Sequence, residues 1–179
     1  RNTADYRVAY GRTDGDVSAN RMDGPLKTDW KLHDRYYLFN LGGAGYDEIR
    51  KIDIKYEEGP GAGMELLKLK NLGVSGEAGV NYYVELREKL KTRENFYYRL
   101  AETLAWKLTP RLQFDEKFEW FPRAEEPRNY RIRFEGSLQY LLGSNLSLVL
   151  TLLDQYATDP AVGVEKNDLQ ILSSVGVKF

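Results

Sequence analysis

The sequence predicts an all-β fold, namely an antiparallel up-and-down transmembrane β-barrel of about ten strands that forms one domain over residues 1–179. Three observations lead to this prediction. Apolar and polar residues alternate with a period of two, short and long connections alternate along the chain, and aromatic residues gather near the predicted strand ends.

The strands are predicted from the alternation, which is clearest at the end of the chain. Leu169, Ile171, Val175, Val177 and Phe179 share one face there, and Gln170, Ser174 and Lys178 share the other. In chain order, the same pattern predicts strands near residues 2–11, 21–32, 36–45, 52–64, 72–84, 96–108, 112–120, 130–142 and 146–153, before the last strand at 169–179. Helical spacing explains these segments less well.

The connections between these strands are predicted to sort onto two sides. Tight turns at 33–35, 109–111 and 143–145 alternate with longer connections at 12–20, 46–51, 85–95, 123–129 and 156–167, and the connection at 65–71 is intermediate. Outer-membrane barrels have short periplasmic turns and longer external loops. This alternation therefore places Phe179 at the periplasmic end.

Aromatic residues are predicted to form a girdle at each end of the barrel, because amphipathic rings prefer the depth of the lipid headgroups. The periplasmic girdle consists of Trp30, Tyr37, Trp106, Phe114, Tyr140 and Phe179. The external girdle consists of Tyr10, Tyr82, Tyr98, Trp120 and Tyr130.

The composition argues against several classes of protein. The 26 basic residues nearly balance the 27 acidic ones, so the chain lacks the basic stripe of a nucleic-acid-binding protein. The absence of cysteine excludes disulfides, thiol catalysis and thiolate metal ligands. The chain contains no apolar run of about 18 residues, so no transmembrane helix is predicted. A tilted transmembrane strand needs only about 9–11 residues.

Charged residues of both signs recur on the polar face, which should line the inside of the barrel. The predicted lumen charge network consists of Lys55, Glu57, Arg99, Lys117, Glu119, Arg131, Arg133 and Glu135. One interpretation is an ion-paired filling that occludes the lumen, and the other is a narrow polar pore. A barrel of about ten strands is small enough for long side chains to occlude it.

No catalytic, metal or cofactor site is predicted. Outer-membrane hydrolases generally need a histidine base, and the only histidine, His33, falls in a predicted tight turn. The acidic pairs Asp14 with Asp16 and Glu125 with Glu126 lack metal-ligand spacing. We therefore expect the protein not to be an enzyme.

Three glutamates depart from the simple pattern. Glu58, Glu102 and Glu116 share parity with the apolar face, where a carboxylate at mid-depth in lipid is unfavourable. Pro60 lies on the same face and predicts a bulge or strand irregularity, because proline cannot donate to the ladder. One explanation is a local bulge that changes the parity, or a glutamate that is protonated or that reaches toward the headgroups. The other is a wall that contacts another protein or protomer.

Several short motifs resemble those of a known family. They are Ala19-Asn20-Arg21, the segment 34–39, Gly59-Pro60-Gly61-Ala62-Gly63, and the segment 154–179 with its closing Gly176-Val177-Lys178-Phe179. By these motifs the chain resembles, over nearly its whole length, the salt-induced outer-membrane protein family, the YdiY-like domain of unknown function. The resemblance implies an outer-membrane β-barrel without implying an activity.

The resemblance has two further implications. Members of that family carry an additional N-terminal stretch, which implies an intact barrel of about twelve strands and leaves the edge at 2–11 either unpaired or closed on the last strand. In addition, Val175, Val177 and Phe179 resemble the C-terminal signal that the outer-membrane assembly machinery recognises.

The sequence therefore predicts a non-enzymatic protein of the bacterial outer membrane that serves envelope integrity, a stress response or a larger envelope assembly. Its expected partners are outer-membrane lipid, the assembly machinery and a protein on the glutamate wall, with no nucleic acid and no cofactor. Three alternatives remain open at this point: a small channel for ions or solutes, an outer-membrane hydrolase, and a soluble barrel with an apolar ligand cavity.

Overall fold

The structure is a computed structural model that describes residues 1–4, 6–13, 16–87, 92–160 and 164–177. These residues form one antiparallel sheet of eleven strands. The strands are β1 (Asn2–Ala4), β2 (Arg7–Thr13), β3 (Asp16–Lys31), β4 (Tyr36–Asp47), β5 (Ile52–Lys68), β6 (Leu72–Leu86), β7 (Arg93–Lys107), β8 (Leu112–Pro122), β9 (Tyr130–Leu141), β10 (Leu146–Ala157) and β11 (Asn167–Val177). No helix in this part of the chain is long and apolar enough to cross a membrane.

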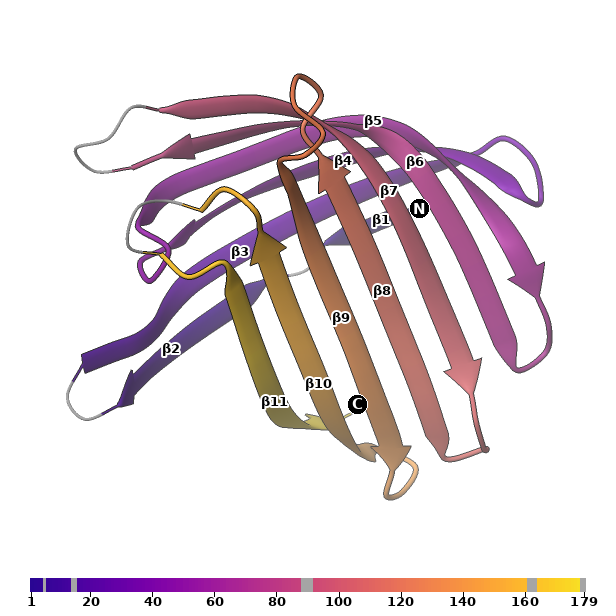
Figure 1. The fold of residues 1–179 in the computed structure, drawn as a ribbon. Helices are drawn as coiled ribbons and strands as arrows, with labels where there is room; N and C mark the ends of the chain where they lie inside the picture. The colour runs from indigo at the N-terminus through magenta and orange to yellow at the C-terminus, as the bar shows by residue number, and fades with distance from the viewer. Residues whose placement is uncertain (5, 14–15, 88–91, 161–163, 178–179) are drawn as a thin grey trace.

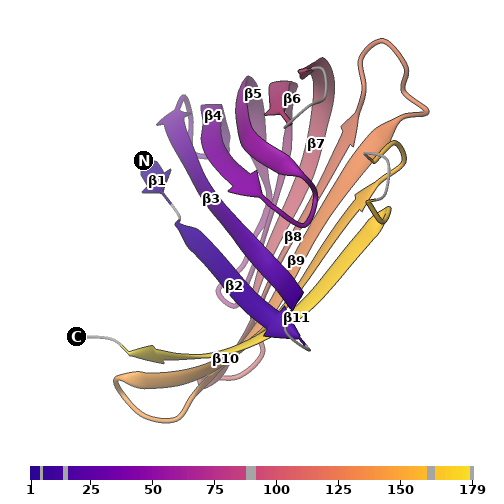
Figure 2. The ribbon, with the colours of Figure 1, turned by 90° about the vertical axis from the view of Figure 1, so that its left-hand side faces the viewer.

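The sheet curls into a half-barrel (Figures 1 and 2), as expected for an up-and-down barrel fold. From β3 to β11 each strand pairs with the next one in the chain. The predicted strand at 2–11 is divided into β1 and β2, which pair with different parts of β3. Within the described residues, β11 pairs only with β10, so β1, β2 and β11 form the two open edges.

The connections sort onto two ends, as the sequence predicts. Turns at 32–35, 69–71, 108–111 and 142–145 lie at one end, which we call the turn end. The connections 48–51 and 123–129 and the residues 158–160 after β10 lie at the other, the loop end. Two predictions were wrong. β5 continues to Lys68, so the connection after it is tight, and the paired strands β2 and β3 occupy most of the predicted long loop at 12–20.

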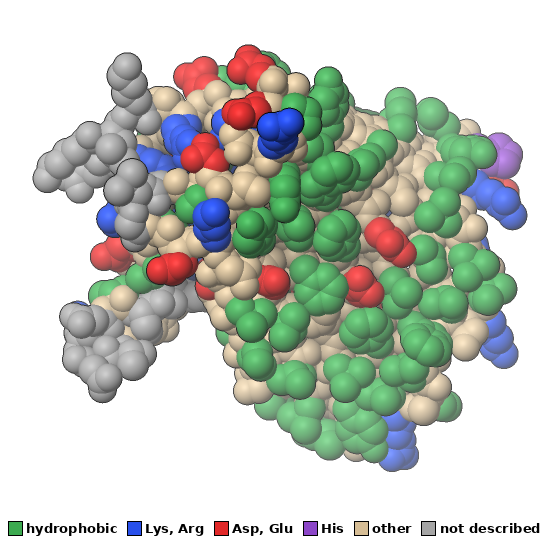
Figure 3. All heavy atoms as spheres, in the orientation of Figure 1, with side chains coloured by type: hydrophobic (Ala, Val, Ile, Leu, Met, Phe, Trp, Pro, Cys, Tyr) green, Lys and Arg blue, Asp and Glu red, His purple; other side chains and the backbone are tan. Residues whose placement is uncertain are grey.

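The two faces of the sheet differ in chemistry. The convex face carries exposed apolar side chains such as Leu148, Leu150 and Ile171, and Figure 3 shows hydrophobic side chains over much of it, with a few acidic ones among them. Charged side chains such as Arg99 and Glu119 are buried on the concave face. This distribution contradicts the alternative of a barrel with an apolar cavity, in which the apolar residues would point inward.

Glycines on β5 leave room for aromatic rings from β4. The register pairs Tyr37 with Gly63 and Phe39 with Gly61. A Cβ at Gly63 would lie 2.2 Å from Cζ of Tyr37, and a Cβ at Gly61 would lie 2.2 Å from Cζ of Phe39. Both rings can therefore lie across β5 only because these positions lack a side chain.

Strand β5 also contains two irregularities. Pro60 and its neighbour Gly59 have no ladder partner in β6, but the register is the same on both sides of them. The register shift lies further along, between Glu65 and Leu67. Pro60 therefore interrupts the ladder as predicted without forming the bulge, and the bulge leaves the outward parity of Glu58 unchanged.

Candidate functional site on the concave face

Arg99 is the centre of the charge network on the concave face, where it is 1% exposed. Glu77 on β6 and Glu119 on β8 both pair in register with Ala101 on β7, so the two carboxylates flank this small residue. They converge on Arg99, which lies two positions away on the same strand. Its Nε and Nη2 donate to Oε1 of Glu119 over 3.0 and 2.7 Å, and its Nη1 donates to Oε2 of Glu77 over 2.9 Å. A buried guanidinium is thus paired with two carboxylates, as burial of charge requires.

Glu77 connects this centre to two strands on the other side of β5. Nζ of Lys27 on β3 forms an ion pair with Glu77, and the hydroxyl of Tyr37 on β4 donates to its Oε1 over 2.7 Å. The Tyr37 ring reaches Glu77 because it crosses β5 at Gly63, which itself pairs with Glu77. Tyr37 therefore faces the lumen, and its predicted place in the periplasmic girdle was wrong.

The Phe39 ring lies between two cations of the network. Nζ of Lys27 lies 4.9 Å from the ring centroid and Cζ of Arg99 lies 5.2 Å from it. Phe39 is almost fully buried. A ring at this distance attracts both cations and excludes water from their carboxylate partner.

The remaining residues of the predicted network also lie on the concave face. Arg133 on β9 binds Glu57 on β5 in bidentate fashion, with N···O distances of 2.9 and 3.2 Å. Nζ of Lys55 lies 2.5 Å from Oδ1 of Asp23, and Nζ of Lys117 lies 3.2 Å from Oε2 of Glu119. Glu135 lines the same space. The pair of Arg133 with Glu57 spans strands that are not neighbours, so it crosses the inside of the half-barrel.

Arg131 differs from the other cations of the predicted network because aromatic rings surround it. Its Cζ lies 3.7 Å from the centroid of Tyr83, 4.2 Å from that of Tyr97 and 5.2 Å from that of Phe121. These three rings form the buried hydrophobic cluster of the described residues. The interior thus contains an aromatic site for a cation that the alternation alone did not indicate.

A cavity of about 1290 Å³ lies on the concave face between the network and the open edges. Arg21 on β3 crosses the opening: its Nη2 donates to Oε1 of Gln170 over 2.6 Å, and its Nη1 lies 3.4 Å from Oδ2 of Asp168. Both partners are on β11. These side-chain contacts connect the two edges of the sheet, which no backbone ladder joins among the described residues.

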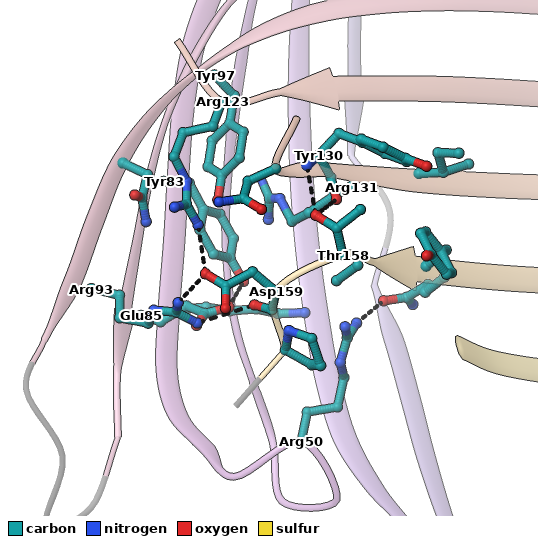
Figure 4. A pocket seen from close by; sticks show the side chains of 18 of the residues that line it. Arg50, Tyr83, Glu85, Arg93, Tyr97, Arg123, Tyr130, Arg131, Thr158 and Asp159 are labelled. Atoms are coloured by element: carbon teal, nitrogen blue, oxygen red, sulfur yellow. Dashed lines mark hydrogen bonds and ion pairs between the residues drawn. The ribbon is translucent and has the colours of Figure 1, made fainter. Parts of the chain in front are cut away.

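A second group of charges lies at the loop end (Figure 4). Asp159 follows β10 and accepts from Nη2 of Arg93 over 2.5 Å and from Nη2 of Arg123 over 3.0 Å. Burial alone would raise the pKa of Asp159, but the hydrogen bonds and positive charges of Arg123 and Arg93 outweigh it and lower this pKa. The carboxylate is therefore ionised in the folded protein over the whole neutral range.

The predicted glutamate wall lies on the convex face. Glu102 pairs with Gly76 and Phe118, and Glu116 pairs with Leu104 and Gly136, so these two glutamates are diagonal neighbours on β7 and β8. Glu58 lies apart from them on β5, paired with Gly42 and Tyr82. Glu58 and Glu102 are exposed, and Glu116 is half-buried. The three carboxylates thus form a pair and one separate position.

The other predicted positions are placed as follows. Val175 and Val177 are exposed on the convex face of β11, and Phe179 lies outside the described residues. His33 is exposed in the turn between β3 and β4. Among the described residues, no group of three or more histidine and acidic side chains is arranged to hold a metal ion.

Comparison with protein-family models gives a match over the whole sequence. A family described as a protein of unknown function, DUF481, matches residues 1–179. No curated protein matches the sequence.

Proposed function

Because the chain belongs to the DUF481 family of proteins of unknown function, we propose that it is a non-enzymatic β-barrel of the bacterial outer membrane with an occluded lumen. Within the family we assign it to the salt-induced, YdiY-like type. Its role would be in envelope integrity or stress response, or as a component of a larger envelope assembly. The proposal assigns it no cofactor and no nucleic-acid partner.

The observation that carries the proposal is the exposed apolar convex face. Leu150, Ile171 and Val175 are 51%, 67% and 61% exposed, and many other large apolar residues of this face are exposed as well. Soluble proteins rarely expose a continuous apolar surface of such extent. Lipid would stabilise such a surface, because most outward side chains would then meet an apolar environment while most charged side chains face the interior.

The concave face supports the occlusion. Arg99, Glu77 and Glu119 are each less than a tenth exposed, and the bidentate contact of Arg133 with Glu57 crosses the lumen. These side chains neutralise one another, so the interior resembles a filled barrel more than an open pore.

Substitutions on the two faces test the membrane location. Leu150→Arg places a cation on the convex face in the middle of β10. Ser174→Arg places the same charge on the neighbouring strand, where Ser174 lines the cavity. In phosphatidylcholine vesicles we expect Leu150→Arg to lower the free energy of unfolding by about 2–4 kcal/mol. Ser174→Arg should change it little, because its side chain has access to the hydrated interior.

The measurement is equilibrium unfolding in urea, followed by tryptophan fluorescence in the vesicles. Equal effects of the two substitutions would contradict the proposal. So would an unsubstituted protein that folds equally well in the absence of lipid and detergent.

A small channel for ions or solutes is the second candidate, and the cavity of about 1290 Å³ favours it. Single-channel recording in planar bilayers separates the two candidates. An occluded barrel gives no steady conductance, whereas a channel gives discrete steps whose ion selectivity changes in Lys55→Glu, because Lys55 lines the cavity.

We also propose that Glu102 and Glu116 contact a protein partner that presents basic or hydrogen-bond-donating groups at the same depth. The two carboxylates are diagonal neighbours, and their ladder partners Gly76 and Gly136 add no side chains of their own. Glu102→Leu with Glu116→Leu should weaken a detergent-stable complex, and Glu58→Leu should weaken it less. An unchanged complex together with a more stable monomer would show that lipid covers this wall, and a self-associated chain would identify the partner as a second protomer.

The end of the chain is proposed to bind the outer-membrane assembly machinery through Val175, Val177 and Phe179. The exposed, outward positions of Val175 and Val177 support this. Phe179→Ala should reduce the amount of assembled protein in cells while refolding in vesicles stays unchanged. A parallel loss in both would indicate a structural role for Phe179.

A further inference from the structure

A small pocket at the loop end contains an excess of arginine. It has a volume of about 50 Å³ and is lined by residues from β5 to β10 and their connections. Three of its cations have carboxylate partners of their own: Lys55 pairs with Asp23, Arg87 with Glu85, and Arg133 with Glu57. Four arginines remain, namely Arg50, Arg93, Arg123 and Arg131. Among the described lining residues, only the carboxylate of Asp159 remains to neutralise them.

Two of these arginines have buried donors that are not used. Nε and Nη2 of Arg131 and Nε of Arg123 are buried and have no hydrogen-bond partner among the described residues. A buried donor without an acceptor is unfavourable, and a charged one is more so. Native proteins satisfy nearly all such groups, so donors of this kind in a pocket indicate a missing acceptor.

The surroundings hold Arg131 in a fixed orientation. The rings of Tyr83 and Tyr97 stand nearly perpendicular, at 81°, and both contact the guanidinium. Stacking of this kind fixes the plane of the guanidinium while leaving its N–H edge available. The hydroxyl of Tyr83 in turn donates to Glu85, which fixes the ring.

Asp159 shows what type of group the pocket accepts. Its carboxylate binds Arg93 and Arg123 together, and Figure 4 shows it between these side chains at the side of the pocket. A carboxylate is planar and has two oxygens, whereas a tetrahedral oxyanion offers further acceptors to a third guanidinium. Arg93 and Arg123 therefore already hold one anionic group together, and an external oxyanion at this place would compete with Asp159.

We propose that this pocket binds an oxyanion, namely the phosphate or sulfate group of a ligand that enters at the loop end. Arg123 and Arg131 donate to it, and Asp159 moves away from Arg123 when it binds. The site lies on the concave face, so its existence does not depend on the proposed membrane location of the convex face. Failure of one proposal would therefore leave the other intact.

Titration of the full chain with inorganic phosphate, followed by calorimetry in detergent, tests the site. We expect the unsubstituted protein to bind phosphate more weakly as salt is raised to about 0.15 M. Arg131→Gln should weaken binding by about tenfold, as expected for loss of a charge-assisted contact. Arg111→Gln is the matched control, because it removes the same charge from an exposed turn at the other end of the sheet. Asp159→Asn should tighten binding, since it removes the competing charge.

Arg123→Gln provides a second test should Arg131→Gln fail to fold, because Arg123 binds Asp159 at the side of the pocket whereas Arg131 lies among three buried rings. Its binding should also be weakened relative to Arg111→Gln. Equal affinities of these variants and the control would overturn the proposal, as would a lack of phosphate binding by both the unsubstituted protein and Asp159→Asn.

A further experiment distinguishes a lipid headgroup from a soluble molecule as the source of the phosphate group. The protein is placed in phosphatidylcholine vesicles with and without phosphatidic acid. If phosphatidic acid competes with phosphate, the ligand is a lipid headgroup, and if it does not, the ligand is a soluble phosphate. Both results support the oxyanion site, and loss of phosphate binding in phosphatidylcholine alone would overturn it.

Discussion

At the level of single residues, Arg99 is the position on which the concave face depends most. It is the shared partner of Glu77 and Glu119, and all three side chains are buried. Replacing both members of a buried ion pair by apolar residues can be neutral, but removing one member leaves an unpaired charge. Arg99 therefore stabilises the fold mainly by neutralising the two buried carboxylates.

Arg99→Met should lower the free energy of unfolding by about 3–5 kcal/mol, because two buried carboxylates lose their guanidinium. Lys117→Met is the control. Lys117 also contacts Glu119, but its side chain is 44% exposed, so its loss should cost less than about 1 kcal/mol. Urea unfolding of both variants in the same vesicles gives the comparison. Similar losses would mean that Arg99 is replaceable by water or by Lys27.

The sequence predicted which side of a strand Arg99, Lys117 and Glu119 occupy, but it did not predict their partners. Arg99 and Glu119 were assigned inward from parity alone, and in the structure both are buried and hydrogen-bonded to each other. Glu77 and Tyr37 were missed as a pair. Their contact depends on the register of three strands and on the missing side chain at Gly63, and neither can be obtained from the period of two.

Arg131 of the pocket was predicted as part of the lumen charge network, but Asp159, Arg50, Arg93 and Arg123 were missed for a different reason. They lie in or beside connections, where no alternation assigns a direction to a side chain. The only signal in the sequence is the number of arginines near predicted strand ends at the loop end. A count of that kind cannot show which guanidinium groups converge.

At the level of elements, β4 and β5 form a unit in which aromatic rings of β4 lie over glycines of β5. Phe39 and Tyr37 lie over Gly61 and Gly63. The alternation places these glycines on one face of the strand. It could not show that their function is to admit rings from the neighbouring strand.

Gly61→Ala should destabilise the protein by about 1–3 kcal/mol, because the new methyl group overlaps the Phe39 ring and forces it to move. Gly42→Ala on β4 is the control, since a Cβ there meets nothing within 4 Å, and its effect should stay within about 0.5 kcal/mol. Thermal or urea unfolding measures both.

A smaller residue at position 39 should compensate for the added methyl group. Adding Phe39→Leu to Gly61→Ala should cost less than the sum of the two single substitutions, because the overlap is relieved. Additive effects would show that the ring and the glycine do not interact as described.

Strand boundaries were predicted well next to tight turns. They were predicted poorly where a strand continues into a segment that was predicted to be a long loop. β2 and β3 pair as far as Thr13 and Asp16, so the predicted loop at 12–20 is mostly strand. The residues there are polar, which suggested a loop, but backbone pairing needs no apolar side chain once neighbouring strands are aligned.

At the level of the whole molecule, the open side of the half-barrel is bridged by side chains. Arg21 reaches from β3 to Gln170 and Asp168 on β11, beside the cavity. The resemblance to a larger barrel predicted that the edge at 2–11 would be either unpaired or closed on the last strand. Among the described residues that edge has no backbone partner beyond β3.

Arg21→Ala should widen this opening. The chain has no cysteine, so spin labels can be attached to Val8→Cys on β2 and Ile171→Cys on β11, both at exposed positions. Pulsed electron resonance should then show a longer and broader distance distribution than in the same labelled pair with Arg21 present. Lys31→Ala, at the other end of β3, should leave the distribution unchanged, and equal distributions for both variants would contradict a bridging role for Arg21.

The contacts that cross the interior have a consequence for how the strands find their alignment. On the convex face, a leucine shifted by two residues still meets an apolar surface, so that face tolerates misalignment by an even number of positions. The concave face does not, because such a shift would separate Arg133 from Glu57 and move Tyr37 away from Gly63 and Glu77. The ion pairs and hydrogen bonds of the interior thus favour one strand register over others that bury the same apolar residues. Their loss would yield mixtures of misaligned sheets with unchanged strand content.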